Sequence, residues 1–159
     1  MPFLMMSRLL KCAALAFTSL VVCSCTKGIS ISCDAEVDGT YYDARCDKNY
    51  YITDGTQKIL LGTYSVEPVL YKFDFADVVV SGDKSTHVHL VTRKNGEIQL
   101  TYLIPQVYEL HPESRPFVLF AEEVCQTPTG DIAITFYSPS EEVEFVVCVD
   151  REMKVRMLD

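Results

Sequence analysis

Two histidines separated by one residue are the part of this sequence that comes closest to a metal site. In an extended strand His87 and His89 lie on the same face of the sheet, and zinc and iron sites hold imidazoles together in this way. A complete site needs further ligands, and no spacing pattern in the chain supplies them. We therefore expect no bound metal and no other cofactor, and keep a carrier of a metal or small ligand as an alternative function. Candidate additional ligands are His111, Glu97, Glu109 and Glu113.

A Ser-x-x-Lys sequence, from Ser81 to Lys84, matches a catalytic motif. In penicillin-recognising enzymes this motif works together with Ser-Asp-Asn and Lys-Thr-Gly sequences, and both are missing from this chain. Gly82 and Asp83, between the two residues, are typical of a turn between strands. The nucleophile elbow, the phosphate-binding loop and the His-Glu-x-x-His zinc motif are missing as well. We therefore expect a binding protein that is not an enzyme and has no catalytic residues.

A long segment with several prolines is the main candidate for a binding site. Residues 105–116 include three prolines and interrupt the pattern of strands for twelve residues. Long connections in β domains often carry binding contacts, although a crossover between two sheets has the same features. Adjacent tyrosines at Tyr41-Tyr42 and Tyr50-Tyr51 are a further candidate, because one tyrosine of each pair faces outward in a strand and can anchor a protein partner. The candidate partner-binding residues of the long segment are Tyr108, Glu109, His111, Glu113 and Arg115.

Short strands must position these side chains. Apolar or alternating segments follow one another at close spacing, and no stretch has a sustained helical period. Asp54-Gly55 and Asn95-Gly96 indicate hairpins, since both pairs tolerate the positive φ of a type I′ turn. We expect an all-β fold, an antiparallel β-sandwich or barrel of about nine or ten short strands. The predicted strands cover residues 50–53, 58–61, 69–75, 77–81, 85–93, 97–104, 117–124, 131–137, 142–149 and 154–158.

The first 24 residues have the features of a signal peptide. Two basic residues precede an apolar run at residues 12–22, which is shorter than the about 20 residues that span a bilayer. The sequence Val22-Cys23-Ser24-Cys25 resembles the lipobox of bacterial lipoproteins, with Ser24 as the small residue and Cys25 as the acylated one. Cleavage before Cys23 and an ordinary secretory signal without lipid remain alternatives. We expect a signal peptide at residues 1–24, the lipidated cysteine and a tether at 25–32, and a single β domain at 33–159.

The charge of the chain bears on its partners and its location. The chain has 14 basic and 22 acidic residues, which argues against nucleic acid as a partner. Removing Arg8 and Lys11 with the leader leaves a net charge near −10. The lipobox resemblance implies an exported protein of the bacterial envelope, held at a membrane, the outer membrane being favoured, by its acyl chains. We expect an envelope or host protein, or cell-wall material, as its partner, with a secreted inhibitor or effector as the alternative.

The number of cysteines predicts disulfides. If Cys25 carries lipid, four cysteines remain in an exported protein and can form two pairs. Cys33 and Cys46 are equidistant from a possible turn at Gly39-Thr40, which favours a bond between them. Cys125 and Cys148 are then left to pair, but a predicted strand lies between theirs, so the chain must cross between sheets for that bond to form. The crossed pairings of these four cysteines remain open.

Overall fold

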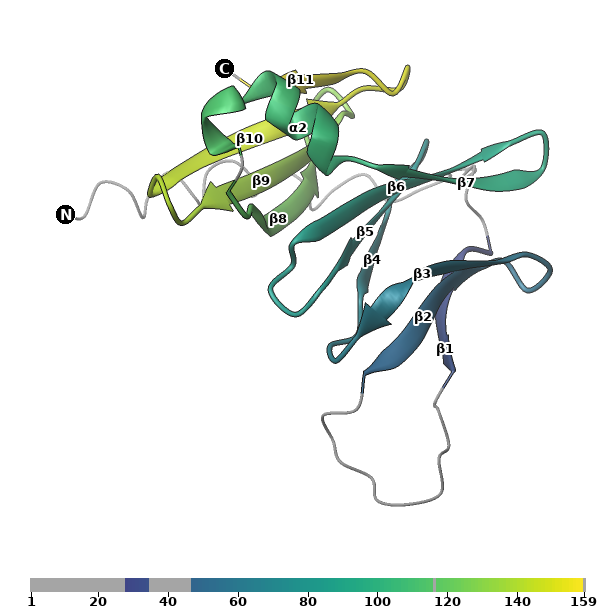
Figure 1. Cartoon of the computed structure of the whole chain (residues 1–159). Coiled ribbons are helices and arrows are strands. Elements are labelled where there is room, and N and C mark those ends of the chain that lie inside the picture. Colours follow the sequence, from purple (N-terminus) through teal and green to yellow (C-terminus); the bar gives the residue numbers. More distant parts are fainter. Residues whose placement is uncertain (1–27, 35–46, 116, 159) are drawn as a thin grey trace.

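Three antiparallel sheets make up the part of the chain that the computed structural model describes, which is residues 28–34, 47–115 and 117–158 (Figure 1). The N-terminal sheet contains β1 (Ser30–Asp34), β2 (Lys48–Thr53) and β3 (Lys58–Tyr64). The middle sheet contains β4 (Val69–Lys72), β5 (Asp77–Ser81), β6 (His87–Lys94) and β7 (Glu97–Tyr102). The C-terminal sheet contains β8 (Phe120–Gln126), β9 (Ile132–Ser138), β10 (Val143–Val149) and β11 (Val155–Met157). Neighbouring strands in each sheet are consecutive in sequence, and none of the sheets closes into a barrel. The expected all-β fold is therefore confirmed, and it is sandwich-like.

The middle sheet packs against another sheet on each of its faces. All five residues of β5 are buried, and successive residues of a strand point to opposite faces. Val79 therefore belongs to the core shared with the N-terminal sheet, where it joins Ile52. Val78 and Val80 belong to the core shared with the C-terminal sheet and the helix that precedes it. Buried partners in this second core include Ile132, Ile134, Phe136, Val147 and Val149.

The two predicted hairpin turns have different geometries. Asn95 and Gly96 both have positive φ, 53° and 77°, as a type I′ turn requires. The connection from β2 to β3 is instead a four-residue loop, in which the Asp54 carboxylate accepts hydrogen bonds from the backbone N–H groups of Thr56 and Gln57 at 2.9 and 2.7 Å. Both sequences thus form hairpins as predicted, but the type I′ turn occurs only at the second.

The folded part of the chain begins earlier than expected. Ile29 is only 1% exposed and packs in the core beside Ile52, and Ser30–Asp34 pairs with β2 as strand β1. Residues 29–32, which the sequence placed in a tether, are therefore part of the structure. The alternation of isoleucine and serine in this stretch has the period of a strand with one buried face. The predicted signal peptide, Cys25 and Tyr41-Tyr42 lie outside the described residues.

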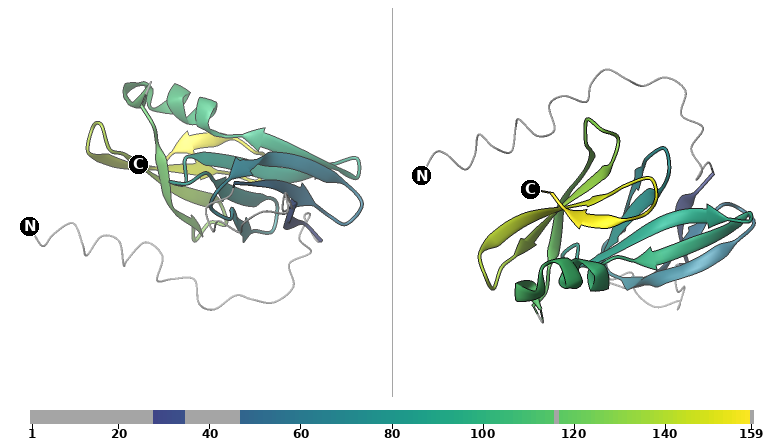
Figure 2. Two further views of the ribbon diagram at one scale, coloured as in Figure 1. Left: turned by 60° about the horizontal axis from the view of Figure 1, so that its bottom comes forward. Right: turned by 90° about the horizontal axis from the view of Figure 1, so that it is seen from above.

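A short helix takes the place of part of the expected loop. Residues Ile104–Leu110 form α2 and Pro112–Ser114 a 3₁₀ turn, where the sequence predicted an irregular connection. Pro105 fits because a helix tolerates proline in its first turn. Ile104 and Val107 are buried in the core that the middle and C-terminal sheets share. The helix itself lies beside these two sheets (Figure 2). Seven residues are too few to show a helical period in the sequence. Among the described residues, no helix is long and apolar enough to cross a membrane.

The expected disulfide between Cys125 and Cys148 is not present. Cys125 of β8 and Cys148 of β10 are both paired with Ala133 of β9, one on each side. Two strands separated by a third lie about 9.6 Å apart, beyond the reach of a disulfide. The prediction is wrong because β8, β9 and β10 form one meander instead of crossing between sheets. Cys33 is exposed, and Cys46, its predicted partner, lies outside the described residues, so this bond stays a prediction.

Candidate functional site

A row of five aromatic rings connects the N-terminal and middle sheets. The ring centroids of Tyr50 and Tyr64 are 6.4 Å apart, and those of Tyr64 and His87 are 5.8 Å apart. Tyr102 then contacts both histidines, with centroid distances of 6.0 Å to His87 and 5.0 Å to His89. We call these residues the tyrosine–histidine row. Tyrosines and histidines from four strands, β2, β3, β6 and β7, thus form one continuous set of ring contacts.

A glycine in β3 makes the first contact of the row possible. The pairing of β2 with β3 shifts register next to Tyr50, which is paired with Gly62. A Cβ atom at Gly62 would overlap the ring and hydroxyl of Tyr64. Because glycine has no side chain, the Tyr64 ring can fold back over this position, and its hydroxyl donates a hydrogen bond to the Leu61 carbonyl at 3.3 Å. The bulge and the glycine together place Tyr64 between Tyr50 and the middle sheet.

The turn that carries the Ser-x-x-Lys sequence positions His87. Ser81 is the last residue of β5 and Lys84 lies in the turn before β6, as the sequence predicted. Gly82 has φ of 89°, and a Cβ atom there would lie 2.9 Å from His87 Nδ1. The same nitrogen is 3.1 Å from the Thr86 hydroxyl. Close packing of this turn against the ring fixes His87 toward Tyr64 and Tyr102.

Burial shifts the pKa values of three rings of the row toward the neutral form. Burial, and after it the neighbouring His87, lowers the pKa of His89, which keeps this imidazole neutral at neutral pH. Burial also raises the pKa of Tyr102, with smaller contributions from Tyr108 and Tyr64. The pKa of Tyr50 is raised, again mainly by burial. Burial therefore favours the neutral form of the His89 imidazole and of the Tyr102 and Tyr50 hydroxyls.

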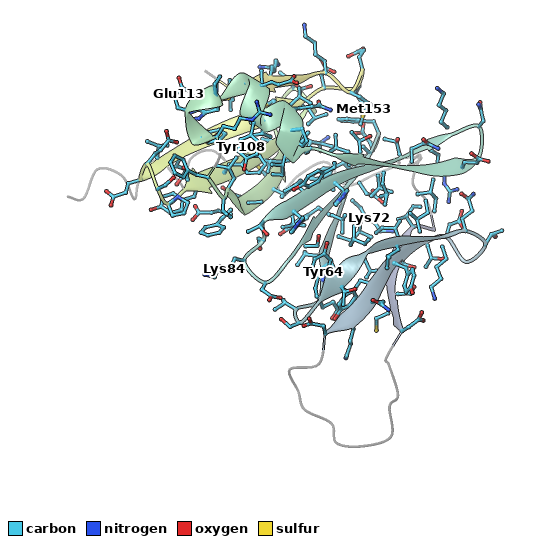
Figure 3. All side chains as sticks on the ribbon, in the orientation of Figure 1. Tyr64, Lys72, Lys84, Tyr108, Glu113 and Met153 are labelled. Atoms are coloured by element: carbon cyan, nitrogen blue, oxygen red, sulfur yellow. The ribbon has the colours of Figure 1, made fainter. Side chains whose placement is uncertain are left out.

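Helix α2 and the segment after it extend the row at the surface. The Tyr108 hydroxyl, on α2, donates a hydrogen bond to the carbonyl of Phe117. Tyr102 is 41% exposed, Phe117 43% and Val118 53%. We call the tyrosine–histidine row together with Tyr108, Phe117 and Val118 the aromatic surface. Figure 3 labels Tyr64 and Tyr108, which lie toward its two ends.

The other predicted partner-binding residues of the segment 105–116 are not part of the aromatic surface. The His111 ring lies flat on Phe145 of β10, at 4.2 Å between centroids and 2° between planes. Its Nδ1 is 3.7 Å from the carboxylate of Glu113. Glu109, Glu113 and Arg115 are exposed along α2 and the 3₁₀ turn. Of the five predicted contact residues, the structure therefore brings only Tyr108 to the aromatic surface.

The predicted additional metal ligands are not brought to His87 and His89. Both histidines do share one face of β6, as predicted, because both contact the ring of Tyr102. His111 packs on the C-terminal sheet, and Glu97 is paired with Lys94 at the far end of the hairpin. Within the described part of the chain, no group of three histidine, cysteine or acidic side chains is arranged to hold a metal ion.

Sequence reasoning missed Tyr64, Tyr102, Phe117 and Val118. Tyr102 had a usable signal, because a two-residue turn at Asn95-Gly96 pairs Lys94 with Glu97 and, counting outward, His89 with Tyr102. No sequence signal pointed to Tyr64, since its contact with His87 joins two different sheets. Comparison of the chain with protein-family models, with curated protein sequences and with solved structures finds no match.

Proposed function

We propose that the chain is a lipid-anchored protein of the bacterial envelope whose β domain binds a protein partner through the aromatic surface. The observation that carries the binding proposal is the exposure of Tyr102, Phe117 and Val118, each more than 40% exposed. Tyr108 links the two segments, because it contributes to the raised pKa of Tyr102 and its hydroxyl donates a hydrogen bond to the Phe117 carbonyl. Tyrosine and other aromatic side chains are enriched at the centres of protein interfaces, because they bury a large area and lose little conformational entropy.

The chemistry of the row also favours a protein partner. Hydroxyl and imidazole groups along the row offer hydrogen bonds to a partner's backbone or polar side chains. Because the rings pack on one another, they are held in place before binding, which lowers the entropic cost of association. The acidic charge of the rest of the chain favours encounter with a partner that has a basic rim.

The anchor is supported by the leader and by the short distance in sequence between Cys25 and the first described residues. The sequence Val22-Cys23-Ser24-Cys25 has the arrangement of a lipobox, and the described fold is already in place at Ile29. Cys25 is thus close enough in sequence to hold the β domain directly at a bilayer.

Intact-mass measurement tests the anchor. Protein extracted from the native membrane should begin at Cys25 and carry the added mass of acyl chains. The Cys25→Ala variant should lose this mass and leave the membrane fraction, whereas the matched variant Cys23→Ala should keep both properties. An unacylated wild-type protein would overturn the anchor and favour the secreted inhibitor or effector, and an acylated Cys25→Ala variant would assign the lipid to Cys23.

Site-specific photo-crosslinking in intact cells tests the binding surface. A photoreactive phenylalanine analogue at Tyr102 or at Phe117 should crosslink to the same protein. The control position is Leu60 on β3, which is 56% exposed and is not part of the aromatic surface, and it should give no such product. Identical products at all three positions would contradict the proposal. Retention of the domain by purified cell wall, lost on Tyr102→Ala, would instead identify cell-wall material as the partner.

A further inference from the structure

A groove runs between the edges of two sheets on the side where the described chain begins. β1 is the edge strand of the N-terminal sheet and β4 is the edge strand of the middle sheet. The groove is open and has a volume of about 510 Å³. Lys72, labelled in Figure 3, donates a hydrogen bond from Nζ to the carbonyl of Ile29 at 2.7 Å and so ties the two edges together. The lining residues are Ile29, Ser30, Ile31, Glu67, Pro68, Val69, Leu70 and Lys72.

The groove is apolar and has no net charge. Val69 lines it and is 50% exposed, and Val66, three residues earlier, is 51% exposed. The charged side chains among the lining residues are those of Glu67 and Lys72, and their charges balance. A chain with a net charge near −10 is repelled by a membrane that contains anionic lipid. The electrostatic repulsion is smallest where the surface that faces the bilayer is neutral and apolar.

The length of chain before the groove places it near a bilayer. Ile29 is four positions after Cys25 in the sequence, and four steps of extended chain reach at most about 14 Å. The polar region of one leaflet is about 5–8 Å thick, so an acyl chain on Cys25 holds Ile29 within a short distance of the headgroups. This step rests on the lipid anchor proposed above.

We propose that the groove between β1 and β4 is the surface on which the protein lies against phospholipid, with Val66 and Val69 inserted at the headgroup level. Lys72 has donors left over after its bond to Ile29, and these reach the lipid phosphates. The acyl chains attach the protein to the membrane, and this contact of few residues orients the β domain on it.

Quenching of a single tryptophan by lipid tests this orientation, because the chain has no tryptophan of its own. The acylated variants Val69→Trp and Val118→Trp are placed in phosphatidylcholine vesicles whose acyl chains carry bromine near the headgroup. The two positions are matched in exposure, at 50% and 53%. Val69→Trp should lose most of its emission, and Val118→Trp should keep the emission that it has in vesicles without bromine.

The outcomes separate the orientation from the anchor. Equal emission of the two variants, with both proteins floating with the vesicles, would overturn the groove as the membrane surface and leave the anchor intact. Protein that carries no acyl mass and does not float would overturn both proposals. Val66→Trp is a second reporter on the same side, and it should be quenched as Val69→Trp is.

Discussion

His89 shows how the environment of a single residue changes the chemistry of the aromatic surface. Its imidazole is packed against Tyr102, and its Nδ1 is buried without a hydrogen-bond partner among the described residues. The sequence showed that His87 and His89 share a face, since this depends only on the period of a strand. It did not show that the face is covered by the N-terminal sheet, because burial depends on how separate sheets pack.

The pKa of His89 predicts a pH dependence of stability. Burial and His87 lower this pKa below its ordinary value, whereas in the unfolded chain the imidazole takes up a proton near pH 6.5. The unfolded state therefore binds more protons in the window between the two pKa values, and the free energy of unfolding falls as the pH drops through it. Urea denaturation between pH 7.5 and 5 should show this loss, and the His89→Gln variant should show less of it. An unchanged pH dependence in the variant would contradict the assignment to His89.

At the scale of elements, two hairpin loops join the N-terminal sheet to the middle sheet. The Gln57 side chain donates a hydrogen bond to the Gly96 carbonyl at 2.8 Å and accepts one from the Ile98 N–H at 2.9 Å. Arg93 of β6 forms an ion pair with Asp54 at 2.8 Å in the same place. These loops lie at one end of the two sheets, at the right of Figure 1, and Tyr64 lies toward the other end.

Gln57 gives a prediction at this scale. Gln57→Ala removes the two hydrogen bonds of the Gln57 side chain. It leaves the part-buried N–H of Ile98 without its acceptor. The free energy of unfolding should fall by about 1–2 kcal/mol in urea denaturation. Gln99→Ala, at an exposed position of β7, is the matched control and should change it by less than about 0.5 kcal/mol. Equal values for the two variants would show that the loops contribute nothing to stability.

Most of the strands could be predicted from the sequence, but the helix could not. Alternation and turn residues located most of the strands and the turn between β6 and β7. Helix α2 was missed because its two buried residues, Ile104 and Val107, are recognisable only once two sheets are in place around them. The aromatic surface was largely missed for the same reason, since its contacts join residues that are distant in sequence.

For the molecule as a whole, β5 connects the two cores. Val79 faces one core and Val80 the other, although the two residues are adjacent. The three sheets should therefore unfold together, because loss of either interface exposes one face of β5.

Val79 and Val80 test this cooperativity. Val79→Ala and Val80→Ala should each lower the free energy of unfolding by about 2 kcal/mol, since each removes buried methyl groups. Circular dichroism and tyrosine fluorescence should report one shared transition in both variants. Val69→Ala, at an exposed position, should stay within about 0.5 kcal/mol of the wild type. Separate transitions for the two probes would show that the two interfaces are independent.

Cys125 and Cys148 lie on either side of Ala133, so folding of the C-terminal sheet competes with formation of a disulfide between them. In the folded C-terminal sheet the two sulfurs are held one strand apart, so native geometry protects them from oxidation to a disulfide with each other. In an unfolded chain the same cysteines meet freely, and a bond formed then would exclude β9 from its place between them. If the chain is exported as we propose, a molecule that folds before it meets an oxidant keeps its native meander, and one that is oxidised first is trapped. The rate of folding relative to oxidation thus decides the yield of native protein.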